Sequence, residues 1–372
     1  MDGNSLEFTA IRGIQAGSAY YVIMVPLKVV PSLFRFDDNA MPADLRAQRV
    51  LNRARVPAIA SYITNNADEY ILSSLCASID GEIEFIPAAS EGALRKVGQL
   101  RIDMGATILI NDGQHRRAAI EDAMRDRPSL GSETISVVVF ADRGLKRSQQ
   151  MFADLNIHAV KPTRSIKLLY NHRDALAALS RDVVTEIPFF RDFTCFEQSS
   201  LSNRSSKFFT LSSLHRATML LIGKTNLNGV TADHLKLGVR FWNAVILNMP
   251  DWQRVSRKEV SAHEMRRDYI HAHGIAAQAI ARAGSQLIEL HPNDWEARLS
   301  GLKDIDWSRG NRSLWDNRAL VGGKVSISKT NVVLVTNVIS RALGLALSAE
   351  EQLIEDQYAP SANNSNRQPK NG

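Results

Sequence analysis

Short apolar runs with the length and composition of β-strands recur along the first half of the chain. They are rich in β-branched and aromatic residues and fall at residues 20–25, 71–76, 81–86, 106–110 and 135–140. Pro26 ends the first run, and the Asp80-Gly81 pair between the second and third indicates a tight turn. These runs predict five strands.

Helical patterns lie between and after these strands. Apolar residues recur at helical spacing over residues 44–64, 114–124 and 145–156, and Pro57 is placed to open a helix at its first turn. Because strand and helix patterns alternate, we expect a mixed α/β domain over residues 1–195.

The second half of the chain has a mostly helical pattern. A Ser-rich stretch at residues 196–206 predicts a loop or linker, and helices are predicted beyond it at residues 211–222, 232–247, 256–287 and 332–347. All five tryptophans fall in this half, which indicates a separate core over residues 207–357. Residues 358–372 are polar and are expected to form a disordered tail. The predicted fold class is α/β of the α+β type, with a mixed-sheet domain followed by a mainly helical one.

The composition is that of a globular protein with material for two cores. Of the 372 residues 44% are hydrophobic, and no apolar run approaches the roughly 18–20 residues that cross a bilayer. The first residues lack the charged start and apolar stretch of a secretory signal. Cys76 and Cys195 are too few for a disulfide framework and too far apart for a zinc site. We therefore expect a cytoplasmic protein with no membrane partner and no metal site.

The chain is basic, and much of the excess charge is local. The net charge is +6, and residues 143–181 alone hold eight basic residues against two acidic ones. Such a balance permits binding to nucleic acid, although a solvated helical face has the same pattern.

The segment after the fourth predicted strand has the pattern of a phosphate-binding helix start. Asp112 is placed to cap the following helix, and Gly113 permits a left-handed turn. The first turn then carries the polar side chains of Gln114, His115, Arg116 and Arg117. Free N–H groups at a helix start and guanidinium forks both suit phosphate oxygens. In the alternative interpretation the two arginines only form ion pairs with Glu121 and Asp122.

This segment resembles the signature of the DGQHR-domain family, whose core is similar to the ParB/sulfiredoxin fold. The signature residues are Asp112, Gly113, Gln114, His115 and Arg116. Four further stretches resemble the DndB family of DNA sulfur modification proteins, and they fall at residues 11–17, 45–55, 151–156 and 269–274. Together the matches extend from near the N-terminus to about residue 330.

The resemblance implies a bacterial DNA-binding transcriptional regulator, expected to repress a gene cluster for DNA phosphorothioate modification. The implied partners are double-stranded DNA at the promoter of that cluster and other DNA sulfur modification proteins. A homo-oligomer is expected. Because the sulfur chemistry of this family belongs to partner proteins, no catalytic residue is assigned.

The resemblance also leaves an enzyme open, because the wider fold family includes members that hydrolyse nucleotides. Such an NTP hydrolase would bind ATP or CTP with Mg²⁺ and would use Asp112, Gln114, His115 and Arg116. Its phosphate-binding residues would also include Gly113, Arg117 and Asn156. Sulfinic acid repair is excluded, because Gln114 stands where sulfiredoxins have their reactive cysteine and an amide is no nucleophile. A third interpretation is a scaffold that binds the modification enzymes through the Trp-bearing helical half.

Two groups of basic residues are candidate contacts to the DNA backbone. They are Arg46, Arg49, Arg53 and Arg55 in one segment, and Lys161, Arg164 and Lys167 in another. The first three share one face of a predicted helix, and the second group surrounds the predicted start of another. Each phosphate that such cations neutralise releases counterions and makes binding salt-dependent. Solvated or internally paired side chains are the alternative for both groups.

The remaining candidates have simpler interpretations. His271 and His273 are two residues apart, so on a helix they point to roughly opposite sides and cannot share a metal; we expect them to be buried or capping. Cys76 lies in an apolar strand and is expected to be an inert core thiol. The basic residues between 254 and 267 are interleaved with Glu259 and Glu264, which is typical of a salt-bridged helix surface, with DNA contact as the alternative.

Overall fold

The computed structural model describes residues 5–34, 53–141, 162–223 and 229–358. Contacts divide the chain into two compact units, Met1–Val160 and Lys161–Gly372, which we call unit 1 and unit 2 and describe one at a time. Each unit has its own cluster of buried hydrophobic residues.

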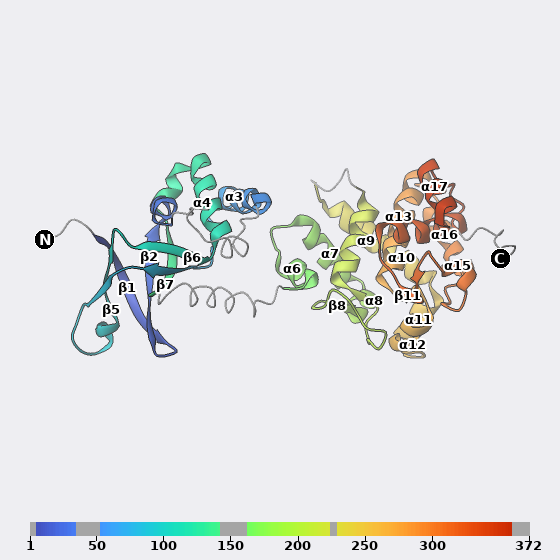
Figure 1. Cartoon of the computed structure of the whole chain (residues 1–372). Helices are drawn as coiled ribbons and strands as arrows, with labels where there is room; N and C mark the ends of the chain where they lie inside the picture. Colours follow the sequence, from blue (N-terminus) through green and yellow to red (C-terminus); the bar gives the residue numbers. More distant parts are fainter. Residues whose placement is uncertain (1–4, 35–52, 142–161, 224–228, 359–372) are drawn as a thin grey trace, which may run out of the picture. The chain divides into compact units, whose positions relative to one another are not determined.

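Unit 1 is built on a seven-stranded mixed sheet (Figure 1). Its strands are β1 (Ser5–Gln15), β2 (Ser18–Pro26), β3 (Leu75–Asp80), β4 (Ile83–Pro87), β5 (Val97–Asp103), β6 (Thr107–Asp112) and β7 (Thr134–Ala141). Their order across the sheet is β4-β5-β1-β2-β7-β3-β6, in which β3 and β7 run parallel and the other neighbours antiparallel. The mixed sheet together with the many helices confirms the predicted α+β class.

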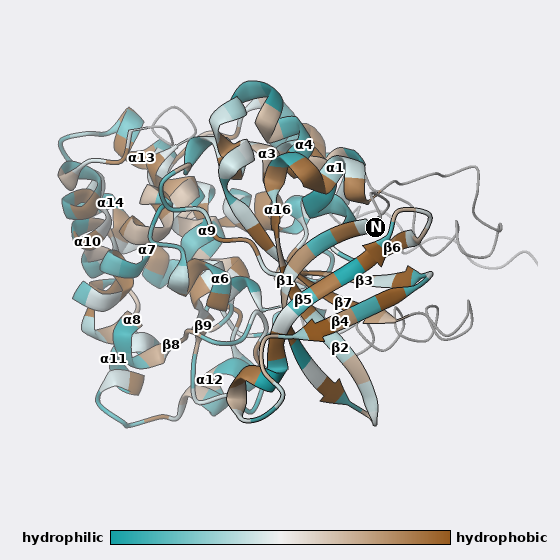
Figure 2. Ribbon diagram, turned by 90° about the vertical axis from the view of Figure 1, so that its left-hand side faces the viewer, coloured by the Kyte–Doolittle hydropathy of each residue, from teal (hydrophilic) through white to brown (hydrophobic). Residues whose placement is uncertain are grey.

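Alternation along the strands gives the sheet a buried face. Ile23 and Val25 of β2 and Val137 and Val139 of β7 are almost fully buried, whereas Met24 between the first two is half exposed. Hydrophobic and hydrophilic residues alternate in the same way along several strands in Figure 2. Because successive side chains of a strand point to opposite faces, this period-2 pattern fixes which face joins the core.

Helices pack beside this sheet, as Figure 1 shows for α3 and α4. They are α1 (Val30–Leu33), α3 (Val56–Asn65) and α4 (Gln114–Asp126), accompanied by 3₁₀ turns that include η2 (Arg53–Arg55), η3 (Ala93–Lys96) and η4 (Pro128–Ser132). Pro57 lies at the first turn of α3, as predicted. Ala60 and Ile63 of α3 and Ala119, Ile120 and Ala123 of α4 join the buried cluster of unit 1.

The strands on either side of Asp80-Gly81 do not form a hairpin. The pattern predicted a tight turn between them, but β3 pairs with β6 and β7, while β4 pairs with β5. Gly81 has φ +150°, and a Cβ there would lie 2.5 Å from the Cβ of Ala106. The glycine therefore permits a close crossing of the chain, through which β3 and β4 enter different parts of the sheet.

Unit 2 is mainly helical (Figure 1). Its helices are α6 (Arg164–Tyr170), α7 (Ala175–Glu186), α8 (Pro188–Phe193), α9 (Leu211–Ile222), α10 (Ala232–Leu247), α11 (Pro250–Ser256), α12 (Ala262–Asp268), α13 (Gly274–Leu290), α14 (Trp295–Arg298), α15 (Arg312–Trp315), α16 (Lys329–Ala342) and α17 (Ala349–Tyr358). Two short strand pairs accompany them, β8 (Thr194–Cys195) with β9 (Phe209–Thr210) and β10 (Leu320–Val321) with β11 (Lys324–Val325).

The core of unit 2 is aromatic, as the tryptophan distribution indicated. All five tryptophans are buried, and Trp252 stacks on Phe189 with ring centroids 5.0 Å apart. Phe190 meets the ring of Trp242 edge to face at the same separation. Offset and edge-to-face contacts are the arrangements that aromatic rings prefer, so this cluster ties α8, α10 and α11 together.

The boundary between the units lies earlier than residue 195, where the sequence pattern placed it. Leu179, Val183 and Phe190, from α7 and α8, belong to the buried cluster of unit 2. The apolar side of α7 packs on α9, an arrangement that the strand-helix alternation of the first half could not reveal. Residues 196–206 run from β8 toward β9 and therefore form a loop within unit 2 rather than a linker. The helix predicted over 145–156 lies outside the described residues, as does the predicted tail except Tyr358, which ends α17.

The long helix predicted over residues 256–287 is broken. It consists of the last residue of α11 followed by α12 and most of α13. Ser261 caps α12 through a capping box with Glu264, and His273 is the N-cap of α13. Both cap residues have extended backbone, which interrupts the helical path, so each of these positions starts a new helix.

Candidate functional site

The turn between β6 and α4 contains the signature residues predicted to bind phosphate. Gly113 is the N-cap of α4 with φ +106°, and no side chain caps this helix. The cap predicted at Asp112 is therefore wrong, because Asp112 still belongs to β6. A Cβ on Gly113 would lie 2.4 Å from Leu75 Cδ2, so both the backbone conformation and the space require glycine.

Arg116 folds back over this turn. Its Nη2 donates to Asp112 Oδ2 at 2.8 Å and to the carbonyl oxygen of Ser74 at 3.1 Å. Its side chain is 22% exposed. The guanidinium thus joins the end of β6 to the residue that precedes β3, and it neutralises the carboxylate next to the helix start.

Arg117 and Gln114 also have partners within unit 1. Arg117 pairs with Glu121 at 3.0 Å and donates to the carbonyl oxygen of Pro31 at 2.8 Å. The buried amide of Gln114 points back to the carbonyl oxygen of Ile110 at 3.5 Å. The ion-pair interpretation therefore holds for Arg117 with Glu121, whereas Arg116 pairs with Asp112 in place of the acids on the helix.

His115 interacts electrostatically with Arg55, one of the candidate DNA contacts. Partial burial lowers its pKa, and the positive charges of Arg55 and Arg116 lower it further, against an opposing effect of Asp112. Arg55 belongs to η2, directly before α3, and α3 packs against α4. The fold therefore brings Arg55, predicted to contact DNA, to the signature turn 60 residues further along the chain.

The other candidate DNA contacts divide between the two units. Arg53 and Arg55 are exposed on η2, and Arg164 and Lys167 are exposed on α6 of unit 2. Among the residues that the structure describes, none of these four side chains has a carboxylate partner. Thr163 caps α6, because its side chain accepts a hydrogen bond from the N–H of Ile166. The remaining candidates, Arg46, Arg49, Asn156 and Lys161, lie outside the described residues.

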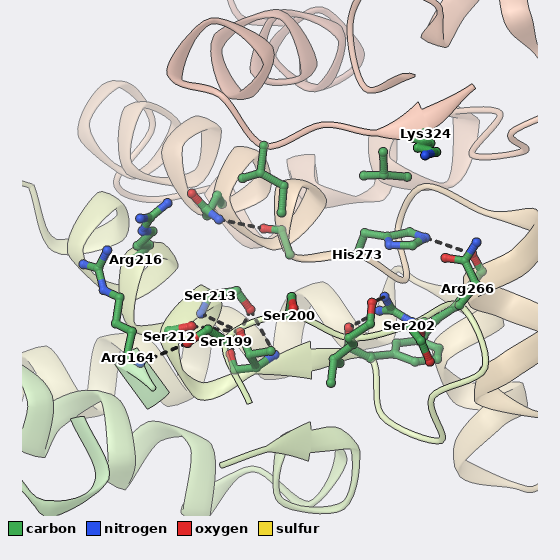
Figure 3. A pocket seen from close by; sticks show the side chains of 18 of the residues that line it. Arg164, Ser199, Ser200, Ser202, Ser212, Ser213, Arg216, Arg266, His273 and Lys324 are labelled. Carbon is green, nitrogen blue, oxygen red and sulfur yellow. Dashed lines mark hydrogen bonds between the residues drawn. The ribbon is translucent and has the colours of Figure 1, made fainter. Parts of the chain in front are cut away.

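Arg164 also lines a cavity in unit 2 that the sequence pattern did not predict (Figure 3). The cavity measures about 630 Å³ and is bordered by the loop at residues 199–203, the starts of α9 and α13 and the β10–β11 hairpin. Its basic residues are Arg164, Arg216, Arg266, Arg309 and Lys324. They come from positions spread over 160 residues, so no local charge run could have shown them; the one local signal was the Ser-rich stretch.

Sequence comparison gives the family of the chain. The sequence model of the DndB family, described as DNA-sulfur modification-associated, matches residues 8–346. The chain belongs to the DndB family. The match includes both units, the signature turn and every residue that lines the cavity. No curated protein and no solved structure matches the chain.

The cysteine and histidine candidates of this DndB-family protein lie in surroundings that indicate structural roles. Cys76 is buried, and burial together with the Asp112 carboxylate raises its pKa to about 12, so the thiol stays protonated. His271 and His273 are buried as predicted. Within the described ranges, no three His, Cys, Asp or Glu side chains are grouped as metal ligands. No described helix is long and apolar enough to cross a membrane.

Proposed function

We propose that this protein is a DNA-binding transcriptional regulator that represses a gene cluster for DNA phosphorothioate modification. Its partner would be double-stranded DNA at the promoter of that cluster, bound by a homo-oligomer. The observation that carries the proposal is the state of the candidate DNA contacts. In the described part of the chain, Arg53, Arg55, Arg164 and Lys167 are exposed and unpaired by any carboxylate.

Many other exposed arginines are used differently. Ion pairs of 2.6–3.1 Å hold Arg125, Arg240, Arg254, Arg257 and Arg267 to neighbouring acids. In a paired arginine a carboxylate already occupies some N–H donors and offsets the charge, whereas an unpaired arginine offers its full charge to a phosphate. The unpaired residues are therefore the better candidates for a DNA backbone contact.

Nucleotide hydrolysis at the β6–α4 turn has less support. It would require the Asp112 carboxylate to hold Mg²⁺, but Arg116 already neutralises that carboxylate at 2.8 Å. Both arginines of the turn are also committed to backbone carbonyls of unit 1. These contacts favour a structural role for Asp112 and Arg116, and they leave the exposed Arg55 of η2 as the cation beside the turn that is free of a carboxylate in the described structure.

The proposal is tested by removing one cation at a time. Arg55→Gln in unit 1 and Lys167→Gln in unit 2 should each weaken binding to the promoter fragment. Each should also lower the slope of log affinity against log salt by about one, because one phosphate contact is lost. Fluorescence anisotropy with labelled duplex at several salt concentrations measures both.

Arg95→Gln is the matched control. Arg95 lies on η3, is exposed and has no ion pair in the described structure, but η3 packs beside β4 and β5, at the sheet edge opposite β6. The control should bind like the wild type. Equal affinities and slopes for all three variants would refute the assignment of these contacts.

A further inference from the structure

The charged side chains that line the cavity of unit 2 are all cationic in the described part of the chain. Five cationic side chains border it, and no Asp or Glu is among its described lining residues. Its volume of about 630 Å³ lies within the roughly 300–1,000 Å³ typical of small-molecule sites. A concave site that gathers one sign of charge focuses the field inside it and attracts the opposite charge.

The cations form two separate groups. Figure 3 shows Arg164 and Arg216 together at one end of the cavity, and Arg266, His273 and Lys324 at the other. Partial burial lowers the pKa of Arg164, and the positive charge of Arg216 lowers it further. Because both side chains are cationic and line the same end, an anion bound there would interact favourably with both.

The end of the cavity at Arg266 also gathers positive charge. Arg266 is buried, and burial together with the charge of Arg309 lowers its pKa to about 10, which still leaves it charged at neutral pH. Its guanidinium donates to the carbonyl oxygens of Leu201, Ser202, Phe208 and Ala272. Arg309 donates to carbonyl oxygens as well. Carbonyl dipoles orient both side chains. The Asp268 carboxylate also interacts with the charge of Arg309, but it is paired with Arg267 and does not line the cavity.

The wall between the two ends offers neutral hydrogen-bonding groups in fixed positions. Five serines line the cavity, namely Ser199, Ser200, Ser202, Ser212 and Ser213, and the hydroxyls of Ser212 and Ser213 are held by Thr210. The loop that carries the first three is tied to α6, because the N–H of Arg164 donates to Ser199 Oγ at 2.9 Å and Ser165 Oγ donates to the carbonyl oxygen of Gln198 at 2.7 Å. A site whose groups are already held in place binds a ligand at a smaller entropic cost.

An apolar surface completes the lining. Ile327 borders the cavity with 45% of its surface exposed, next to Val325 on β11. A sugar or a base could cover such side chains while phosphates occupy the cationic ends. Charge, hydroxyls and an apolar wall together are the features that a nucleotide requires.

We propose that the cavity of unit 2 binds a phosphate-bearing small molecule of nucleotide size, with Arg216 and Lys324 as contacts at its two ends. This site is separate from the β6–α4 turn. Arg164 belongs to both assignments, but the contacts tested here, Arg216 and Lys324, are not among the proposed DNA contacts, so failure of this proposal can be distinguished from failure of the regulatory one. The bound anion supplies the negative charge that the described lining lacks.

Isothermal titration calorimetry of the full chain with ATP at low salt tests this site. The wild type should bind ATP, and its thermal unfolding midpoint should rise with ATP concentration. Arg216→Gln and Lys324→Gln should each weaken binding at least about ten-fold, because each removes a charge-assisted contact. Both side chains are exposed, so circular dichroism should show that the variants fold.

Two controls separate this site from general attraction of anions. Arg312→Gln changes an exposed arginine of α15 that lies outside the cavity lining, and it should bind ATP like the wild type. Pyrophosphate should displace ATP, because the proposed contacts are made to phosphate. No ATP binding, equal loss in the control, or no displacement by pyrophosphate would overturn the proposal. It would also be overturned if duplex DNA displaced ATP and itself lost affinity in Arg216→Gln, because the cavity would then belong to a DNA-binding surface.

Discussion

At the scale of single residues, Gly113 determines how β6 passes into α4. The resemblance and the turn pattern both singled out this glycine, and its φ of +106° confirms the need for a left-handed conformation. The sequence could not show that Leu75, 38 positions earlier, closes the space beside it. The same holds for Arg116, whose acceptors at Asp112 and Ser74 are joined only by the fold.

Gly113→Ala should therefore destabilise unit 1 by roughly 2–4 kcal/mol, the sum of backbone strain and a clash with Leu75. Urea unfolding followed by circular dichroism measures the change. Gly17→Ala is the control, since Gly17 has φ +70° but no neighbour within 4 Å of a Cβ. Gly17→Ala should lower the free energy of unfolding only by the backbone strain, about 1 kcal/mol. Equal losses in the two variants would contradict the close packing at Gly113.

His273 should make the stability of unit 2 depend on pH. Burial, followed by the charge of Arg266, lowers the pKa of its imidazole to about 3, against about 6.5 in the unfolded chain. The folded state then binds fewer protons below pH 6.5, so this part of the stability is fully present at pH 7 and is lost as the pH falls.

The expected loss between pH 7 and pH 5 is about 2 kcal/mol. In His273→Gln the amide can still donate to the carbonyl oxygen of Arg266, as His273 Nε2 does at 2.8 Å, but it does not titrate. Urea unfolding at pH 7, 6 and 5 should therefore show a shallower pH dependence in the variant. The same dependence in both proteins would show that His273 is not buried in its neutral form.

At the scale of elements, helix positions could be predicted better than strand partners. The predicted bounds of α9 and α10 agree with the structure to the residue, because an N-cap threonine and an amphipathic pattern are local signals. Strand pairing is not local: β3 and β4, neighbours in sequence, lie near opposite edges of the sheet. The break before α12 was missed, although Ser261 and Glu264 have the capping-box spacing that marks the start of a new helix.

Ser261→Ala should destabilise unit 2 by about 1 kcal/mol. The hydroxyl accepts from the N–H of Glu264 at 3.2 Å, while the Glu264 carboxylate accepts from the N–H of Ser261 at 2.9 Å. Ser256→Ala is the control, since this exposed serine at the end of α11 has no hydrogen-bonded hydroxyl in the described structure. Urea unfolding midpoints measure the stability of both variants. Equal midpoints for Ser261→Ala and Ser256→Ala would contradict the capping role.

At the scale of the whole molecule, the two buried clusters share no residue. Composition and tryptophan distribution predicted two cores, but the boundary required the contacts of α7 and α8. The cavity of unit 2 could not be predicted, because its cations come from five separate segments.

Separate cores predict two transitions in calorimetric unfolding of the full chain. Ile23→Ala, in the core of unit 1, should lower one midpoint, and Phe190→Ala, in the core of unit 2, should lower the other. Each substitution should lower the free energy of unfolding of its unit by several kcal/mol, which corresponds to a fall of roughly 10 °C in the unfolding midpoint. A single transition that moves in both variants would show that the units unfold together.

The central claim, that this DndB-family protein binds the promoter of its own gene cluster, is tested most directly by binding to that DNA. The purified full chain would be titrated with the promoter fragment and with a scrambled duplex of equal length, over several salt concentrations, with and without ATP or CTP plus Mg²⁺. We predict tighter binding to the promoter, an affinity that falls steeply with salt and no consumption of nucleotide. Equal, weak binding to both duplexes, together with nucleotide hydrolysis, would contradict the account.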